Sequence, residues 1–383
     1  MMVSKLPLVG TNIFTVMSGL AREHQAINLA QGFPDFPVSP NLIHAVTEAM
    51  QQGLNQYAPM TGLPELREAI STKISRCYGI DVNTDTEVTI TPGGTYAIYT
   101  ALSTILQPGD EVIILEPAYD SYIPNILVNG GVPICVPLKF PDYAVDWNRV
   151  KDAITTRTKA IIINTPHNPT GYVWTANDMQ QLTALTENTS IYIISDEVYE
   201  HITMDGRPHI SVLTIPALRA RSIVVYSFGK VFHATGWKMG YCIAPPELSA
   251  EFRKYHQFLS FSCNTPMQAG LATFMQNEEE YLSLPAFYEA KRNLFLSLLE
   301  KLPFTIYQPT PGSYFQLAGY EKINDMPDKE FAIWLTKEYG VAVIPVSAFN
   351  HDGKDDKLVR FCFAKKEETL HAAFEKLSRL KQA

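Results

Sequence analysis

The chain has few cysteines, little charge and no long hydrophobic run among its 383 residues. Its cysteines, Cys77, Cys135, Cys242, Cys263 and Cys362, are scattered, form no CxxC pair and mostly have apolar neighbours. This pattern indicates reduced, buried thiols of a cytosolic protein and disfavours both disulfides and a zinc site. We therefore expect no metal.

The sequence also lacks the features of a membrane or nucleic-acid-binding protein. No apolar run reaches membrane-spanning length, and the initial stretch "MMVSKLPLVGTNIF" has no signal-peptide core. The formal net charge of -8 provides no basic face for nucleic acid. We expect a soluble, cytoplasmic protein.

Core-forming residues are abundant. Hydrophobic residues make up 46% of the sequence, and a chain of 383 residues is too long for one simple core, so two lobes are expected. Short β-branched runs alternate with helical patterns, which predicts an α/β fold with a mostly parallel sheet covered by helices on both faces. The candidate strands span 87–90, 111–115, 160–164, 191–195, 222–226 and 241–244.

The pattern changes near residue 285. From there on, a long helical stretch and shorter apolar segments indicate a smaller α+β lobe. These segments are a helix at 287–302, runs at 305–308 and 313–319, a helix near 328–339, runs at 341–346 and 358–364, and a final helix.

Chemically distinctive residues follow the candidate strands, at the edge where doubly wound sheets bind ligands. The stretch "TPGGTYA" opens a helix, so the backbone N–H groups of Gly94 and Thr95 could bind an anion, although an ordinary turn explains the glycines equally well. The stretch is neither a Walker loop nor a GxGxxG fingerprint, which disfavours nucleotide binding.

Two further polar residues stand at such positions and a third, Arg360, lies inside an otherwise apolar strand; each has an alternative explanation. Asp196 ends the strand in "IYIISDEVYE" and needs a cation or donors, or else caps a helix. Asn168 in "NTPHNPTG" either binds a ligand or forms a turn, whereas neighbouring His167 has no partner spacing and is interpreted as incidental. Arg360 in "LVRFCFA" either grips a carboxylate or is a snorkelling edge arginine.

Lys230, in "SFGKVFHATGWKMGY", follows the apolar run "SIVVYSF", and Lys238 lies in the same stretch. A lysine just past a buried strand is costly unless its amine is used. Together these residues indicate one ligand with three groups. They are a phosphate that binds at a helix start, a ring nitrogen that pairs with an acid and a carbonyl that reacts with an amine. Pyridoxal 5′-phosphate has these three groups.

The sequence resembles the class I, fold-type I pyridoxal-phosphate aminotransferases over nearly its whole length. Within them it is most similar to bacterial methionine aminotransferases of the kynurenine/glutamine transaminase-like branch. The resemblance rests on "NLAQGFPDF", "NQYAPMTGLPELREAI", "TPGGTYA", "EPAYDSY", "NTPHNPTG", "SDEVYEH", "SFGKVFHATGWKMGY" and "RFCFAKKEETL".

The resemblance implies a fold and a division of the chain. A large cofactor-binding domain at 46–285 would contain a mostly parallel seven-stranded sheet between helices. A small α+β domain would comprise 286–383, and residues 1–45 would form an N-terminal arm and part of that small domain.

The resemblance also assigns catalytic and ring-binding roles. Lys230 matches the lysine that forms the Schiff base and then serves as general base. Asp196 matches the acid that faces the pyridine nitrogen, and Tyr199 and Asn168 match donors to the phenolate oxygen of the ring. Tyr119 matches the aromatic residue that stacks on the cofactor.

The remaining contacts with the cofactor involve its phosphate. Gly94, Thr95 and Ser227 match phosphate ligands, and Lys238 stands where many relatives have arginine, which puts a bidentate grip at that position in doubt. Tyr57 matches a tyrosine that crosses the interface of a homodimer to the partner's phosphate, so shared active sites are implied.

For the substrate, Arg360 matches the arginine that holds the α-carboxylate, assisted by Gly32 and Asn168. Phe14 lies where relatives place an aromatic residue in the side-chain pocket. The implied reaction transfers the amino group of a large neutral amino acid (methionine, an aromatic residue, leucine or glutamine) to a 2-oxo acid by a ping-pong mechanism.

The sequence also bears on three other functions. A cysteine-conjugate β-lyase would use the same residues and stays open. A non-catalytic ligand sensor is disfavoured, because the sequence contains no additional basic segment and every catalytic position is filled. A nicotinamide-dependent dehydrogenase lacks its glycine fingerprint.

Overall fold

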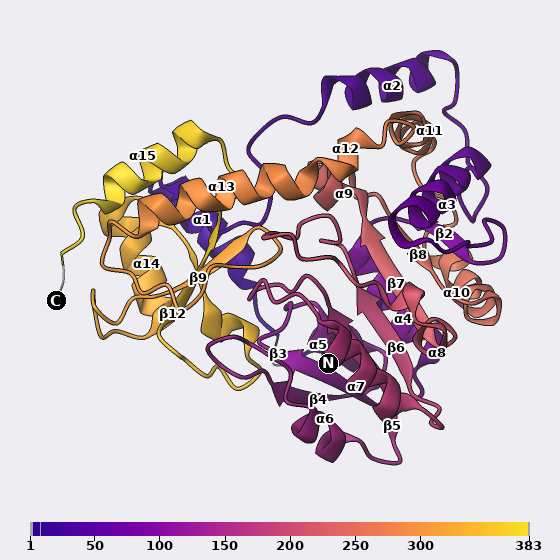
Figure 1. Ribbon diagram of the computed structural model, residues 1–383, viewed down its shortest axis with the longest axis horizontal. Coiled ribbons are helices and arrows are strands. Elements are labelled where there is room, and N and C mark those ends of the chain that lie inside the picture. Colours follow the sequence, from indigo (N-terminus) through magenta and orange to yellow (C-terminus); the bar gives the residue numbers. More distant parts are fainter. Residues whose placement is uncertain (1–2, 8, 382–383) are drawn as a thin grey trace.

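A seven-stranded sheet lies at the centre of the computed structural model, which describes residues 3–7 and 9–381 (Figure 1). Its strands are β2 (Val88–Thr91), β3 (Glu111–Glu116), β4 (Val132–Pro137), β5 (Thr158–Asn164), β6 (Tyr192–Asp196), β7 (Ser222–Ser227) and β8 (Gly240–Ile243). Their order is β2-β8-β7-β6-β5-β3-β4, and within this described sheet only β8 runs antiparallel to its neighbours. The predicted α/β class and the mostly parallel seven-stranded sheet are confirmed.

One strand of this sheet, β4, was absent from the sequence prediction. It contains Pro133 and Pro137, and its residues are largely half-buried or exposed. Proline lacks the N–H group of a strand ladder, so it is tolerated mainly at sheet edges, and β4 is an edge strand. The other strands lie within a residue or two of their predicted bounds because they are buried on both faces.

Helices cover the two faces of the sheet. The helix α4 (Gly94–Ile105) buries Ala97, Ile98, Ala101 and Leu102, the periodic apolar positions of its sequence, against the sheet and α10. The other helices of this region are α2 (Pro40–Gln51), α3 (Pro64–Tyr78), α5 (Tyr122–Val128), α6 (Trp147–Ala153), α7 (Ala176–Thr186), α8 (Pro216–Arg219), α9 (Phe228–Val231), α10 (Pro246–Leu259), α11 (Thr265–Phe274) and α12 (Glu279–Leu282), with 3-10 turns η1 (Val212–Thr214) and η2 (Thr235–Trp237).

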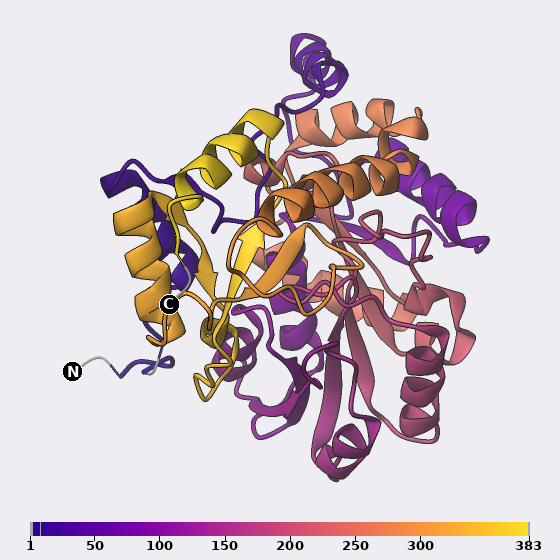
Figure 2. The ribbon, with the colours of Figure 1, turned by 60° about the vertical axis from the view of Figure 1, so that its left-hand side comes forward.

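A second, three-stranded antiparallel sheet has the order β11 (Ile344–Pro345), β12 (Leu358–Cys362), β9 (Phe315–Gly319). Around it lie α1 (Ile13–Glu23), α13 (Leu284–Leu299), α14 (Asp328–Tyr339), η3 (Val346–Phe349) and α15 (Glu367–Leu377). The helix α1 packs against α14, as Figure 2 shows for the indigo and orange helices at one side of the molecule. The helix α14 has its predicted bounds, and α13 begins and ends about one turn before the predicted helix 287–302. The predicted run at 305–308 contributes only a bridge from Thr305 to Gly319.

The N-terminal residues join this smaller region. The strand β1 (Ile27–Asn28) pairs in parallel with β10 (Val341–Ala342). The expected division of the chain at 45 and 285 stays a prediction, and residues 1, 2, 8, 382 and 383 of its outer parts lie outside the described residues. None of the helices in the described part of the chain combines the length and apolar character needed to cross a bilayer.

The topology gathers many strand ends at one edge of the large sheet. The parallel strands β2, β3, β5, β6 and β7 all end there, and the antiparallel β8 begins there. The strand β12 of the smaller sheet also contributes a side chain, Arg360, to a cavity at this edge. The functional site is therefore expected between the two sheets.

Candidate active site

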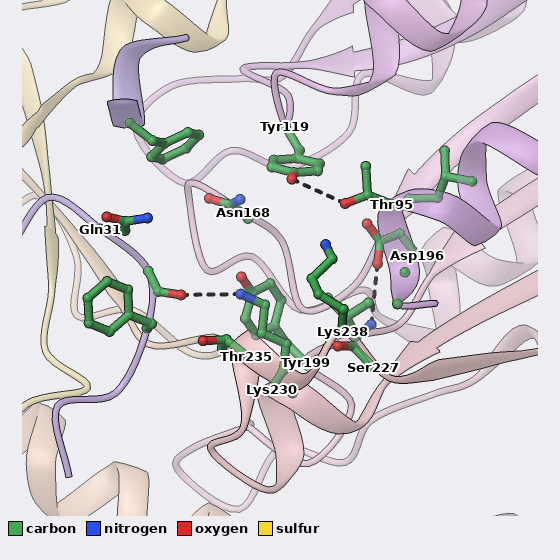
Figure 3. Close-up of a pocket in the computed structure, with 18 of the residues that line it drawn as sticks. Gln31, Thr95, Tyr119, Asn168, Asp196, Tyr199, Ser227, Lys230, Thr235 and Lys238 are labelled. Carbon is green, nitrogen blue, oxygen red and sulfur yellow. Dashed lines mark hydrogen bonds between the residues drawn. The ribbon is translucent and has the colours of Figure 1, made fainter. Parts of the chain in front are cut away.

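A cavity of about 480 Å³ lies at this edge (Figure 3). It brings together all but one of the residues that the sequence singled out: Phe14, Gly32, Gly94, Thr95, Tyr119, Asn168, Asp196, Tyr199, Ser227, Lys230, Lys238 and Arg360. The exception is Tyr57, whose side chain is 83% exposed and packs edge-on against Phe261 outside the cavity.

Lys230 lies in α9, one turn after β7 ends. Its ammonium nitrogen donates to the carbonyl of Gly32 at 3.2 Å and lies 5.6 Å from the centre of the Tyr199 ring (Figure 3). Burial lowers the pKa of Lys230 from 10.5 to about 8, since a buried amine is poorly solvated when charged. A useful fraction of this amine is therefore neutral near physiological pH and able to act as nucleophile or base.

Asp196 is the last residue of β6 and is buried. One carboxylate oxygen accepts from the Tyr122 hydroxyl at 2.7 Å, and the other accepts from the backbone N–H of Val198 at 3.4 Å. Burial raises the pKa of Asp196 to about 6, although the hydrogen bond from Tyr122 opposes the shift. Both donors are neutral, so a cationic ring nitrogen would stabilise the charged carboxylate further.

An anion cradle lies at the start of α4. Gly93 has φ 86°, a left-handed conformation, and directs the N–H groups of Gly94 and Thr95 at the cavity end of the helix. A side-chain carbon at Gly93 would lie 3.7 Å from Nζ of Lys238. Lys238 itself has φ 54°, and Ser227 lines the same part of the cavity. Backbone donors, a hydroxyl and an ammonium group thus surround one small volume, as a phosphate requires.

Tyr119 follows β3 and lies beside this cradle. Its hydroxyl is 3.4 Å from that of Thr95 (Figure 3). Burial raises the pKa of Tyr119, so the phenol stays protonated at neutral pH. The ring stands edge-on to that of Tyr122, at 5.7 Å between centroids, and it lines the cavity.

Arg360 is fully buried in β12. Its guanidinium group donates to Oδ1 of Asn168 at 2.6 Å and to the carbonyl of Ala30 at 2.9 Å, and it lies 3.8 Å from the centre of the Phe315 ring. Its Nε–H has no partner among the described residues. Burial lowers the pKa of Arg360 to about 10, so the group stays charged. A buried cation with an unused donor is suited to a ligand carboxylate.

The walls beside Arg360 are apolar. The rings of Phe14 and Phe349 each lie 5.1 Å from its guanidinium carbon and 5.9 Å from one another. Among the described residues that line the cavity, the lysines and arginines are Lys230, Lys238 and Arg360.

Sequence reasoning missed two residues of the site. Tyr122, one helical turn beyond Tyr119 in "EPAYDSY", donates to Asp196. Asn164 ends β5 in register with Asp196, donates to the Asp196 carbonyl at 2.8 Å and accepts from the Asn168 N–H at 2.7 Å. Asn164 could have been found from the sequence, because Asn164 and Asp196 are polar residues at the last positions of two neighbouring apolar strands. His167, interpreted as incidental, is buried and hydrogen-bonds the Thr170 hydroxyl at 2.8 Å.

Known proteins resemble the chain over its whole length. A methionine aminotransferase from Escherichia coli (strain K12) is 48% identical, over 98% of this chain and 98% of its own length. A solved structure from Escherichia coli, described as having a methionine aminotransferase function, covers 99% of this chain and 100% of its own, with 48% identity and a TM-score of 0.96.

Two more distant relatives cover the chain equally well. The structure of N-succinyldiaminopimelate aminotransferase from Mycobacterium tuberculosis is 36% identical, covers 100% of both chains and has a TM-score of 0.95. Kynurenine–oxoglutarate transaminase 1 from Rattus norvegicus is 32% identical over 99% of this chain and 97% of its own. The family model for aminotransferase class I and II matches residues 24–377. The chain therefore belongs to the class I and II aminotransferases and has their fold-type I architecture.

Proposed function

We propose that this aminotransferase uses pyridoxal 5′-phosphate and moves the amino group of a large neutral amino acid, methionine foremost, to a 2-oxo acid. The observation that carries the proposal is one cavity with a partly neutral buried lysine, a buried carboxylate and a buried arginine between aromatic walls. Each of these three groups has a distinct task in transamination.

The residues of the cavity fit the cofactor. Gly94, Thr95, Ser227 and Lys238 would hold its phosphate at the start of α4. Tyr119 would cover a face of its ring. Bound there, pyridoxal phosphate supplies an electron-withdrawing ring that stabilises negative charge at the α-carbon of the substrate.

The other ring contacts come from the strand ends. Asp196 would hold a proton on the ring nitrogen, because its buried carboxylate otherwise has only neutral donors. Asn168 and Tyr199 would donate to the ring hydroxyl from the opposite side of the cavity. Burial raises the pKa of Tyr199, which keeps its hydroxyl protonated and able to donate.

Lys230 has two tasks in the proposed reaction. Its amine would hold the cofactor covalently until the substrate amine takes its place, and it would then be free to accept the α-proton. By lowering the Lys230 pKa to about 8, burial keeps part of the amine neutral for this purpose. The same nitrogen would give the proton back, and hydrolysis by water would then release the 2-oxo acid and complete the half-reaction.

Arg360 orients the substrate. The α-carboxylate would take up the unused Nε–H donor and share the guanidinium fork with Asn168. This contact would place the α-carbon between Arg360 and Lys230. The α-proton would then already lie near the lysine amine that accepts it. Gly32, whose carbonyl accepts from Lys230, lies at the same end of the cavity.

The substrate side chain would lie against Phe14 and its neighbours. An aspartate or glutamate side chain would bury a second carboxylate without a cation of its own, since Lys230, Lys238 and Arg360 have other partners in the reaction. A thioether or aryl group would gain from leaving water. Similarity to the methionine aminotransferase from Escherichia coli supports the same preference.

We expect kcat/KM to be higher for methionine than for aspartate by at least about 100-fold under saturating 2-oxo acid, because burying an unpaired carboxylate costs a few kcal/mol. Asparagine is the matched control, since it has the size of aspartate without the charge, and it should fall between the two. A higher kcat/KM for aspartate would show that a cation reaches the side-chain pocket.

β-Lyase activity on cysteine conjugates is the alternative that the same residues support, since removal of the α-proton by Lys230 precedes either outcome. Pyruvate release from a β-substituted alanine, compared with oxo-acid-dependent turnover of methionine, separates the two activities. Pyruvate release that exceeds transamination would make elimination the principal reaction.

A homodimer with shared active sites is part of the proposal. Tyr57 is 83% exposed, and near it Phe258, Leu259 and Phe261 are 86%, 49% and 51% exposed. Large aromatic side chains seldom stay in water as a group, so this patch is suited to a second copy of the chain. Resemblance to the family places Tyr57 at the phosphate of that copy.

Mixing a Lys230→Ala protein with a Tyr57→Phe protein should restore activity, because each mixed dimer contains one site with both residues intact. Random exchange of equal amounts makes about a quarter of all sites wild type. The measurement is methionine turnover after subunit exchange, compared with each variant alone. Sedimentation of the wild-type enzyme as an active monomer would contradict the shared site.

A further inference from the structure

Three potential metal ligands from distant parts of the chain meet beside the active site. Glu116 is the last residue of β3, Cys135 lies in β4, and His351 follows η3. One ligand atom from each lies within 4.8 Å of the other two. Neither the proposed transamination nor the cofactor uses any of them.

Strand pairing in the large sheet, together with the contact between the two sheets, brings these three residues together. Cys135 faces Ile114 in the β3–β4 register, and Glu116, two residues on, shares that face of the sheet. His351 approaches from the smaller sheet's side and donates its backbone N–H to one Glu116 oxygen at 2.9 Å, while its Nδ1 lies 2.7 Å from the other. The backbone contact holds the carboxylate so that one oxygen faces the thiol and the imidazole.

We propose that Glu116, Cys135 and His351 form a zinc site that ties the β3–β4 edge of the large sheet to the 346–351 segment. Thiolate, imidazole and carboxylate are the ligands that zinc prefers, and tetrahedral coordination needs only one water in addition. Glu116 and His351 already share a hydrogen bond, which zinc would replace.

The charges also match. Burial and the neighbouring Glu116 carboxylate raise the pKa of the Cys135 thiol, so the empty site holds a protonated thiol. Zinc binding releases the thiol proton and displaces the proton on Nδ1 of His351, which Glu116 accepts in the empty site, and the thiolate and carboxylate together then neutralise the ion. The imidazole binds through Nδ1 and keeps its other nitrogen protonated toward solvent, since the His351 side chain is 53% exposed. His351 also lines a cavity of about 670 Å³.

Bound zinc would also act on the active site. Phe349, two residues before His351, lies against Phe14 and Arg360 and accepts the backbone N–H of Ala118 at 2.8 Å. A metal bond at His351 would therefore hold Phe349, which packs behind the Phe14 wall of the cavity, against the segment that follows β3. We expect zinc to inhibit turnover by restricting this wall; this effect rests on the proposed function, whereas zinc binding itself does not.

The test titrates the cofactor-loaded, reduced enzyme with Zn²⁺ against a metal-binding indicator. We expect about one ion per chain, with affinity lowered at least about tenfold in Cys135→Ser and His351→Ala. Co²⁺ should give the visible bands of a tetrahedral site with thiolate ligation in the wild type and lose them in Cys135→Ser. Zinc should also raise the unfolding temperature of the wild type but not of either variant.

Matched controls exist in the chain. Cys77→Ser removes another half-buried thiol, and His44→Ala removes a histidine that lies 3.3 Å from Glu48 without a cysteine. Both should bind zinc as the wild type does. Equal zinc affinity in all four variants would overturn the site, and zinc binding that depends on Cys135 but leaves methionine turnover unchanged would overturn the inhibition.

Discussion

Replacing Lys230 with alanine is expected to lower kcat/KM for methionine by at least about 10⁴-fold, because in the proposed reaction one amine both binds the cofactor and moves the α-proton. In the structure no other lysine that lines the described cavity takes this position, since Lys238 lies at the anion cradle. Steady-state turnover measures the loss. Borohydride reduction followed by mass spectrometry should find the cofactor attached to the wild type and absent from the variant.

Lys254→Ala is the control, since it removes an exposed lysine of α10 that pairs only with Glu251. A small added amine should restore part of the proton transfer to Lys230→Ala, which a misfolded variant could not show. In the cofactor-free wild type, capture of pyridoxal phosphate should speed up as pH rises through about 8, because burial lowers the Lys230 pKa to that value and only the neutral amine reacts. A borohydride-fixed adduct on Lys230→Ala would disprove the assignment.

Asp196→Asn is expected to keep the cofactor but to lower kcat by at least about 1000-fold. The amide still accepts the hydrogen bond from Tyr122, yet it has no charge with which to hold a proton on the ring nitrogen. The loss should appear in kcat more than in KM, since Arg360 still holds the substrate carboxylate.

The controls for Asp196 separate charge from structure. Asp152→Asn makes the same change on the exposed face of α6 and should leave turnover unaltered. Tyr122→Phe keeps the carboxylate but removes its donor, so it should have a smaller effect than Asp196→Asn. A near-wild-type rate in Asp196→Asn would refute the role of the carboxylate.

Much of the fold could be predicted because its strands are apolar on both faces. The strands β5, β6 and β7 are continuous β-branched runs, and a run of that kind is typical of a strand that is buried on both faces of a sheet. The edge strand β4 was not predicted, because its prolines and its half-exposed residues interrupt the continuous apolar pattern that marks the other strands.

The site was predictable wherever a polar residue ends an apolar strand, as Asp196 does, since parallel strands bring their carboxyl ends to one edge. The roles of Phe14, Gly32 and Tyr57, in contrast, came from resemblance, because nothing in their local sequence pattern marks them.

Some contacts between distant segments could not be predicted from the sequence. The scattered cysteines indicated no zinc site, yet Cys135 lies beside Glu116 and His351 through sheet register and the contact between the two sheets. The hydrogen bond from Tyr122 to Asp196 likewise depends on how α5 packs. A single sequence gives spacing along the chain, and these contacts depend on tertiary packing.

The reversed direction of β8 has a mechanical consequence. The chain leaves the sheet edge at Ser227, forms α9 and η2, and returns to the same edge at Gly240, paired in register with Ser227. Lys230 and Lys238 therefore sit on one short loop whose two ends are clamped by neighbouring strands, whereas Arg360 is carried by the other sheet. Movement of one sheet relative to the other would shift Arg360 relative to the cavity, and it would leave Lys230 and Lys238 fixed with respect to each other. In the proposed function, the two lysines that would hold the cofactor therefore keep their spacing while the arginine that would bind the substrate moves with the other sheet.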